Sequence, residues 1–124
     1  MRLLDSNIVI YVAQKEHEWL RVDILSQPFA VSQATRAEVL GWHRITPEDA
    51  ADLGEFLAAG AHLSITDEIV NRAIELRQHR KMSLGDSLIA ATALLHGLEL
   101  VTRNTDDYKH IAGLRTVNPF QNLL

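Results

Sequence analysis

Residues 3–7 read Leu3-Leu4-Asp5-Ser6-Asn7, a short apolar run that ends in an acidic residue followed by two polar ones. A second apolar run follows too closely to be the other arm of a hairpin, so we predict a strand, a tight turn and a helix that Ser6 caps. Ligands of open α/β sheets bind at the carboxyl ends of the strands, which is where Asp5 stands. Because an acid at a helix N-terminus also stabilises the helix by itself, the role of Asp5 depends on its companions.

Short apolar runs alternate with amphipathic segments along the rest of the chain. Strands are expected at about residues 2–5, 29–31, 61–65, 99–102 and 115–117, and the later helices at 16–26, 33–44, 47–60, 67–81 and 83–97. This order predicts an α/β fold with a central parallel sheet of about five strands flanked by helices, an α/β/α sandwich. With 124 residues and 47% hydrophobic content, we expect a single domain spanning residues 1–124.

The composition restricts the chemistry that is available. The chain has no cysteine, which excludes disulfides and thiolate metal sites and suits the cytoplasm, and its six histidines lack the spacing of a zinc helix. The net charge of −4 argues against binding nucleic acid by general electrostatic attraction, so any such contact should be local or helped by cations. No apolar run is long enough for a signal peptide or a membrane span, so we expect a soluble protein with no membrane contact.

Several oxygen ligands follow the expected strands. Asp5 follows the first strand, Glu38 lies in the helix after the second, and Asp86 heads the apolar helix before the fourth. Carboxylates gathered at one sheet edge without lysine or arginine repel each other unless a cation is bound. Hard oxygen ligands favour Mg²⁺ or Mn²⁺, which activate water and neutralise charge on a phosphodiester. The alternative is a set of unrelated helix-capping acids, Asp86 pairing with Ser83 in a capping box.

Four motifs in order carry a resemblance over essentially the whole chain. They are Leu3-Leu4-Asp5-Ser6-Asn7, Ser32-Gln33-Ala34-Thr35-Arg36-Ala37-Glu38, Asp86-Ser87-Leu88-Ile89-Ala90-Ala91-Thr92-Ala93, and Thr102-Arg103-Asn104-Thr105-Asp106-Asp107-Tyr108 with the later Gly113-Leu114 and Asn118-Pro119. Together they resemble the PIN-domain nucleases, and more narrowly the VapC-type ribonuclease toxins of bacterial toxin–antitoxin pairs. The resemblance implies a PIN fold, Mg²⁺-dependent endoribonuclease activity and a homodimer. It also implies a small antitoxin whose tail blocks the acidic pocket.

Matched by position to those motifs, Asp5, Glu38 and Asp86 correspond to the family's three core acids and are expected to bind metal. The fourth ligand position is open between three residues that follow the fourth strand, Asn104, Asp106 and Asp107. Many members carry an acid where this chain has Asn104, whereas Asp107 matches a second acid common among the toxins. Because the Asn104 side chain brings no charge, Asp107 is the fourth residue that we assign to catalysis.

Other polar residues near these motifs are expected to support the site. Asn7, Ser32 and Thr102 match polar positions beside the pocket and are interpreted as supports for the metal ligands. Arg103 lies beside the pocket in sequence and is expected either to meet a substrate phosphate or to be an ordinary surface arginine.

The leading hypothesis is a Mg²⁺-dependent endoribonuclease, with Mn²⁺ as a substitute, that leaves 5′-phosphate and 3′-hydroxyl ends. Asp5 and Asp86 would hold the metal while Glu38 completes its shell or aligns the attacking water. One alternative is a catalytically weak PIN-fold protein that acts through partner binding. Another is a receiver-like signalling domain, which has the right length and pattern but needs an acidic pair after the first strand, where this chain has only Asp5.

Overall fold

The computed structural model describes residues 1–121 of the chain. One sheet of five parallel strands has the order β3-β2-β1-β4-β5. The strands are β1 (Arg2–Leu4), β2 (Phe29–Ser32), β3 (Ala61–Leu63), β4 (Glu99–Val101) and β5 (Thr116–Val117). In the centre of the sheet, Leu3 of β1 lies opposite Ala30 of β2 and Leu100 of β4. The predicted parallel sheet of about five strands is confirmed.

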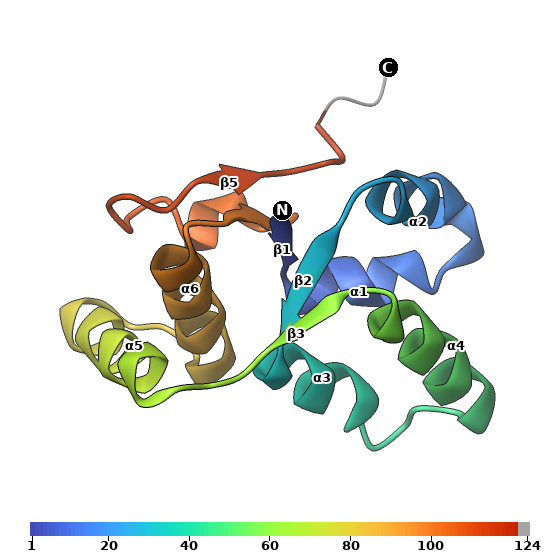
Figure 1. The fold of residues 1–124 in the computed structure, drawn as a ribbon, viewed down its shortest axis with the longest axis horizontal. Helices are drawn as coiled ribbons and strands as arrows, with labels where there is room; N and C mark the ends of the chain where they lie inside the picture. Colours follow the sequence, from blue (N-terminus) through green and yellow to red (C-terminus); the bar gives the residue numbers. More distant parts are fainter. Residues whose placement is uncertain (122–124) are drawn as a thin grey trace.

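Helices cover both faces of this sheet (Figure 1). On one side lie α1 (Ser6–Val12), α2 (Glu18–Leu25), α3 (Gln33–Leu40) and α4 (Pro47–Ala58), and on the other side lie α5 (Asp67–His79) and α6 (Leu84–His96). Two short 3₁₀ turns, η1 (Lys15–His17) and η2 (Thr105–Asp107), complete the described elements. The molecule is therefore the three-layer α/β/α sandwich expected from the sequence.

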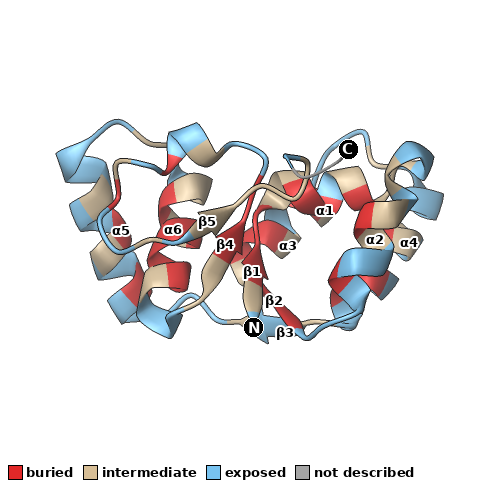
Figure 2. Cartoon of the chain, turned by 90° about the horizontal axis from the view of Figure 1, so that it is seen from above, coloured by how far each residue is buried: buried red, intermediate tan, exposed pale blue. Residues whose placement is uncertain are grey.

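Consecutive strand residues point to opposite faces of the sheet and enter different parts of the core. Leu3 and Leu100 pack with α6 residues such as Ile89, whereas Leu4 and Val101 pack with the core formed by α1, α2 and α4. Figure 2 shows the buried residues concentrated in the strands and on the helix sides that face them. Because both faces are covered, β1, β2 and β4 carry consecutive apolar residues, Leu3-Leu4, Phe29-Ala30-Val31 and Leu100-Val101, and show no alternating polar pattern.

The strand order changes direction between β1 and β4. From β1 the chain adds β2 and then β3 on one side, and then passes through α5 and α6 to place β4 on the other side of β1. Such a switch point opens a crevice at the carboxyl ends of the two strands. Asp5 follows β1 and Thr102 follows β4, so both residues lie at this crevice.

Helix caps explain where the structure differs from the sequence prediction. Ser6 does not cap α1: Asp5 is the N-cap, and its carboxylate accepts a hydrogen bond from the Ser6 N–H. The helix predicted to reach residue 44 ends at Leu40, since Gly41 leaves the helical conformation (φ −88°, ψ 3°). The helix predicted to reach residue 81 ends at His79, because Arg80 is extended (φ −157°, ψ 149°).

Residues typical of helix ends begin and end the other helices. Ser32, Thr66 and Ser83 accept backbone hydrogen bonds at the starts of α3, α5 and α6, and Pro47 opens α4. Gly97 ends α6 in the left-handed conformation (φ 64°), which glycine adopts without steric cost. None of the helices described in residues 1–121 is long and apolar enough to cross a membrane.

Candidate functional site

The carboxylate of Asp5 is the centre of the candidate site and is almost fully buried, with 4% of the residue exposed. Its Oδ1 accepts the Ser6 N–H at 2.8 Å. Its Oδ2 accepts the hydroxyls of Thr102 at 2.8 Å and Tyr108 at 3.0 Å. Asp5 therefore caps α1 and also lies at the meeting point of β1, β4 and η2, so its role as a helix cap is compatible with a role in a site.

The surroundings of Asp5 disfavour its negative charge. Burial raises the pKa of Asp5, the hydrogen bonds from Thr102 and Tyr108 lower it in part, and the nearby Asp86 carboxylate raises it again. The net result is a pKa above the ordinary value of 3.8. A positive charge placed beside these two acids would offset both the burial and the repulsion.

Tyr108 joins Asp5 to Asp86. Its hydroxyl lies 3.0 Å from Oδ2 of Asp5 and 3.1 Å from Oδ1 of Asp86, and only 1% of the residue is exposed. Burial and the two carboxylates raise the pKa of Tyr108 far above its ordinary value, so the phenol keeps its proton and serves as a donor. Tyr108 is absent from the site residues that the sequence predicts. The available signal was a tyrosine directly after Asp107, which does not reveal that its ring turns inward.

Asp86 takes part in the site and in the helix cap through different atoms. Its backbone N–H donates to the Ser83 hydroxyl at 3.1 Å, which is one half of the capping box considered from the sequence. Its side chain does not complete that box and accepts from Tyr108 instead. The carboxylate of Asp86 is therefore directed toward Asp5.

Glu38 is attached to the same region through Ser6. The Ser6 hydroxyl donates to Oε1 of Glu38 at 3.1 Å and lies 3.2 Å from Oγ1 of the buried Thr35. The Glu38 carboxylate also rests on Gly85, where an added Cβ would lie 2.7 Å from Oε1. Ser6 and Gly85, which the sequence does not single out as site residues, thus place Glu38 at the head of α6, next to Asp86.

The residues that follow β4 line two polar hollows beside these acids. The first, of about 480 Å³, is lined by Asp86, Asp106, Asp107 and the basic residues Arg80 and Lys81, among others. The second, also about 480 Å³, is lined by Arg103, Asn104, Thr105, Asp106, Asp107, Asn118 and Gln121.

The three candidates for the fourth ligand position differ in which hollows they line. Asp107 shares a hollow with Asp86, whereas Asn104 does not line that hollow. The backbone N–H of Asn104 donates to Oγ1 of Thr102 at 3.0 Å, and Asp106 forms an ion pair with Lys109 at 3.8 Å.

The expected supporting residues differ in what they touch. Thr102 contacts Asp5 directly. Ser32 is fully buried and accepts the Ala34 N–H at 3.0 Å, so it caps the helix that carries Glu38 without touching the acids. Asn7 has no hydrogen bond to the acids in the described part of the chain, and its Oδ1 is buried without a partner there.

The acids do not form a complete metal site by themselves. Within residues 1–121, no three histidine, aspartate or glutamate side chains come close enough to enclose a metal ion. Mg²⁺ is usually bound through one or two carboxylates, with water and substrate phosphates completing its shell. In the described residues none of Asp5, Glu38 and Asp86 forms an ion pair with a basic side chain, so their charge is available to such a cation.

Comparison with known proteins identifies the family. Residues 2–114 match the model of the PIN domain. Ribonuclease VapC10 of Mycobacterium tuberculosis is 32% identical over 114 residues, which cover 84% of this chain and 83% of that protein. A solved toxin-antitoxin complex from Klebsiella pneumoniae contains a chain that is 32% identical with a TM-score of 0.78, covering 96% of this chain and 98% of that one. VapBC2 from Rickettsia felis, bound to a DNA fragment from its promoter, has the same fold at 22% identity, with a TM-score of 0.81 over 94% of this chain and 97% of that one. The chain therefore belongs to the PIN domain family, as a member of the VapC type.

Proposed function

We propose that this protein is a Mg²⁺-dependent endoribonuclease that acts in the cytoplasm as the toxin of a toxin–antitoxin pair. The observation that carries the proposal is the buried Asp5 carboxylate, which shares the Tyr108 hydroxyl with Asp86 and has no basic partner in the described residues. The ribonuclease and toxin-antitoxin relatives at 32% identity support the same activity.

The hydrogen bonds indicate which oxygen atoms would face the cation. Among the described residues, Asp5 Oδ2 accepts hydrogen bonds from two hydroxyls, whereas Oδ1 accepts only the Ser6 N–H. In the described residues Asp86 accepts a hydrogen bond only at Oδ1 and Glu38 only at Oε1, which leaves Asp86 Oδ2 and Glu38 Oε2 without a donor. Asp5 and Asp86 would therefore hold the metal, and Glu38 would complete its shell or orient the attacking water.

When bound, Mg²⁺ would neutralise charge on the phosphodiester and lower the pKa of the attacking water. Tyr108 and Thr102 keep the Asp5 carboxylate in one orientation, and Tyr108 does the same for Asp86. Asp107, which shares a hollow with Asp86, is the fourth acid of the proposal, and Asn104 is a weaker candidate. Mn²⁺, which takes the same oxygen ligands, is expected to substitute.

Cleavage of RNA by the purified protein tests this proposal. With Mg²⁺, we expect internal cuts that leave 5′-phosphate and 3′-hydroxyl ends. Asp5→Asn keeps the shape of the side chain while removing its charge, so it should abolish cleavage without unfolding the chain. Full cleavage in EDTA, or by the Asp5→Asn variant, would overturn the proposal.

An apolar groove beside Glu38 supports an antitoxin partner. The groove, of about 350 Å³, is lined by Ile10, Ala13, Gln14, Glu38, Val39, Trp42, Ile45, Asp49 and Leu53. Ile10 is 50% exposed and Trp42 is 54% exposed, although both are large apolar residues. An apolar segment of the antitoxin would cover these two residues. Since Glu38 also lines the groove, the end of that segment would reach the acids.

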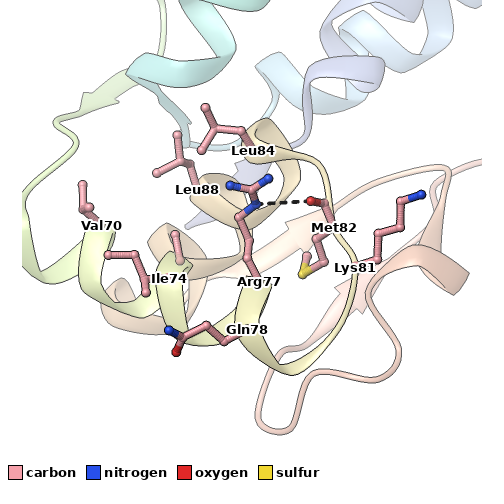
Figure 3. A pocket seen from close by; sticks show the side chains of 9 residues that line it. Val70, Ile74, Arg77, Gln78, Lys81, Met82, Leu84 and Leu88 are labelled. Atoms are coloured by element: carbon pink, nitrogen blue, oxygen red, sulfur yellow. Dashed lines mark hydrogen bonds between the residues drawn. The ribbon is translucent and has the colours of Figure 1, made fainter.

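A second apolar surface, between α5 and α6, is the proposed contact of a homodimer. Figure 3 shows Val70 and Ile74 of α5 beside Leu84 and Leu88 of α6, around a hollow of about 450 Å³. Ile74 is 48% exposed and Leu84 is 58% exposed. Light scattering is expected to give the mass of a dimer for the parent protein and of a monomer for Ile74→Asp. A monomeric parent protein would exclude this part of the proposal.

A further inference from the structure

Arg103 is held over two aromatic rings at the edge of the candidate site. Its guanidinium carbon lies 4.1 Å from the ring centre of Phe120 and 4.9 Å from that of Tyr11. These rings belong to a cluster of edge-to-face contacts that also contains His17 and Trp19. The backbone carbonyl of Arg103 accepts the side-chain amide of Asn118 at 3.3 Å. Both ends of Arg103 are therefore positioned before any ligand arrives.

The charge of Arg103 is not used within the described part of the chain. The residue is exposed, and its guanidinium N–H groups have no hydrogen-bond acceptor or acidic partner among residues 1–121. Another exposed arginine, Arg115, which directly precedes β5, donates to the carbonyl of Gly97 at 3.0 Å. A flat guanidinium with free N–H edges is well suited to a phosphate, because its donors match two phosphate oxygens and the stacking limits its motion.

Arg103 lies in a hollow that adjoins the one containing Asp86. Arg103 lines the second polar hollow, and this hollow shares Asp106 and Asp107 with the first, which contains Asp86, Arg80 and Lys81. Basic residues therefore line both of the hollows that share Asp106 and Asp107, although the chain as a whole carries a net charge of −4. A polyanion that crosses both hollows would meet a cation in each of them.

We propose that Arg103, held by Tyr11 and Phe120, binds a phosphate of single-stranded RNA next to the one that is cut. This inference rests on the proposed nuclease function and adds a residue that positions the substrate. The stacked guanidinium offers its free N–H edges to a ligand. The group that Arg103 recognises is therefore the phosphodiester, which every nucleotide carries, and not a particular base.

Binding of a fluorescently labelled single-stranded oligoribonucleotide tests this role. The measurement is fluorescence anisotropy in the non-cleaving Asp5→Asn background, at several salt concentrations and without divalent metal. Adding Arg103→Ala should weaken binding about tenfold and reduce the slope of log K against log[salt] by about 0.7, the value for one phosphate contact on a single strand. Phe120→Leu keeps the charge and removes one ring, so it should weaken binding with little change in slope. Arg115→Ala is the matched control and should leave both quantities unchanged.

Each outcome separates a binding role from a structural one. If Arg103 only fastens the segment around Phe120, Arg103→Ala will lower the melting temperature while RNA affinity and salt slope stay the same, and the inference is overturned. Equal effects of Arg103→Ala and Arg115→Ala, or no RNA binding by the background variant, also overturn it. If Asp5→Asn does not fold, Asp86→Asn is used as the background.

Failure of the nuclease function would look different. A parent protein that cuts no RNA with Mg²⁺, in a background where Arg103→Ala still weakens RNA binding, removes the nuclease function and leaves the phosphate contact standing. Normal cleavage by the parent protein together with unchanged RNA binding by Arg103→Ala removes the phosphate contact and leaves the nuclease function standing.

Discussion

Gly85 lies directly against the carboxylate of Glu38, since a Cβ at position 85 would come within 2.7 Å of Oε1 and 2.9 Å of Oε2. The contact joins α3 to the residue that precedes Asp86. The end of a glutamate side chain moves easily, so a larger residue at position 85 should displace Glu38 without disturbing the backbone. Gly85 is thus required for the position of an acid and not for a turn.

Gly85→Ala should therefore separate activity from stability. We expect the displaced Glu38 carboxylate to lower RNA cleavage about tenfold or more, in line with the effect of losing a group that positions a metal ligand. The free energy of unfolding should change by less than about 1 kcal/mol, since alanine is a better helix former than glycine. Rates of cleavage and urea denaturation measure the two effects.

Gly54→Ala is the control for this substitution. Gly54 is also helical, and an added Cβ there meets nothing within 4 Å. Its replacement should stabilise the protein by about 0.5–1 kcal/mol without changing cleavage. Normal cleavage by Gly85→Ala would show that the position of Glu38 does not matter.

Tyr108→Phe should make Mg²⁺ binding more sensitive to pH. The Tyr108 hydroxyl lowers the pKa of Asp5, so its removal raises that pKa further and lets protons compete with the cation. We expect the dissociation constant for Mg²⁺, measured by calorimetry over a range of pH, to rise by up to about tenfold at the acidic end of the range and less at higher pH. Tyr11→Phe keeps its ring, and Tyr11 is not among the hydrogen-bond partners of Asp5 in the described residues, so this variant should bind Mg²⁺ as the parent protein does. An unchanged dissociation constant at every pH would argue against this role of Tyr108.

Asp5→Asn should stabilise the metal-free protein at neutral pH. Because the pKa of Asp5 is raised above 3.8 in the folded protein, the folded state binds the proton more tightly than the unfolded chain. The stabilising contribution of that proton is complete below pH 3.8 and is lost as the pH rises through the raised pKa. Asparagine stays neutral, so the variant should melt at a higher temperature than the parent near neutral pH, and the difference should shrink toward pH 4.

Mg²⁺ should make the parent protein more stable than Asp5→Asn. At a concentration 100 times its dissociation constant, the cation should stabilise the parent protein by about 2.7 kcal/mol and leave Asp5→Asn nearly unchanged. Scanning calorimetry with and without Mg²⁺ measures both. A metal-free parent protein that is more stable than the variant at neutral pH would contradict the assigned electrostatics.

Asp107→Asn should weaken Mg²⁺ binding more than Asp106→Asn does. Both residues line the hollow that contains Asp86, but Asp106 is already paired with Lys109. Asn104→Ala should have the smallest effect, because Asn104 does not line that hollow. Calorimetric titration of the three variants checks this order, and equal affinities would leave the fourth ligand position empty.

Ile10→Asp should weaken binding of the antitoxin without lowering RNA cleavage. Ile10 lines the apolar groove beside Glu38, and a charge there would have to be buried by the partner. Val22→Asp is the matched control, since Val22 is 65% exposed on α2 and lies outside this groove. Affinity for the protein encoded next to this chain is the measurement. Equal affinities of the two variants would place the partner elsewhere.

Much of the fold could be predicted because it depends on local rules. Ser32, Thr66 and Ser83 cap their helices as their sequence positions suggest, and Gly97 ends α6. The end predicted at residue 44 was wrong because Trp42 continues the apolar pattern past a change of backbone conformation at Gly41, and the end predicted at residue 81 was wrong because Arg80 is extended. Periodicity does not detect such a change.

The sequence by itself predicted the fold class, which the structure confirms, and it singled out Asp5, Glu38 and Asp86 by their places around the apolar strands and by their match to the family motifs. The tertiary structure decided how these acids are connected. Tyr108 lies 103 residues after Asp5 in the chain, and its hydroxyl reaches Asp5 only because β4 is placed beside β1. The contact between Gly85 and Glu38 likewise requires α3 and α6 to meet. Hydrogen bonds and close packing between distant segments depend on positions in space, and spacing along the chain does not specify them.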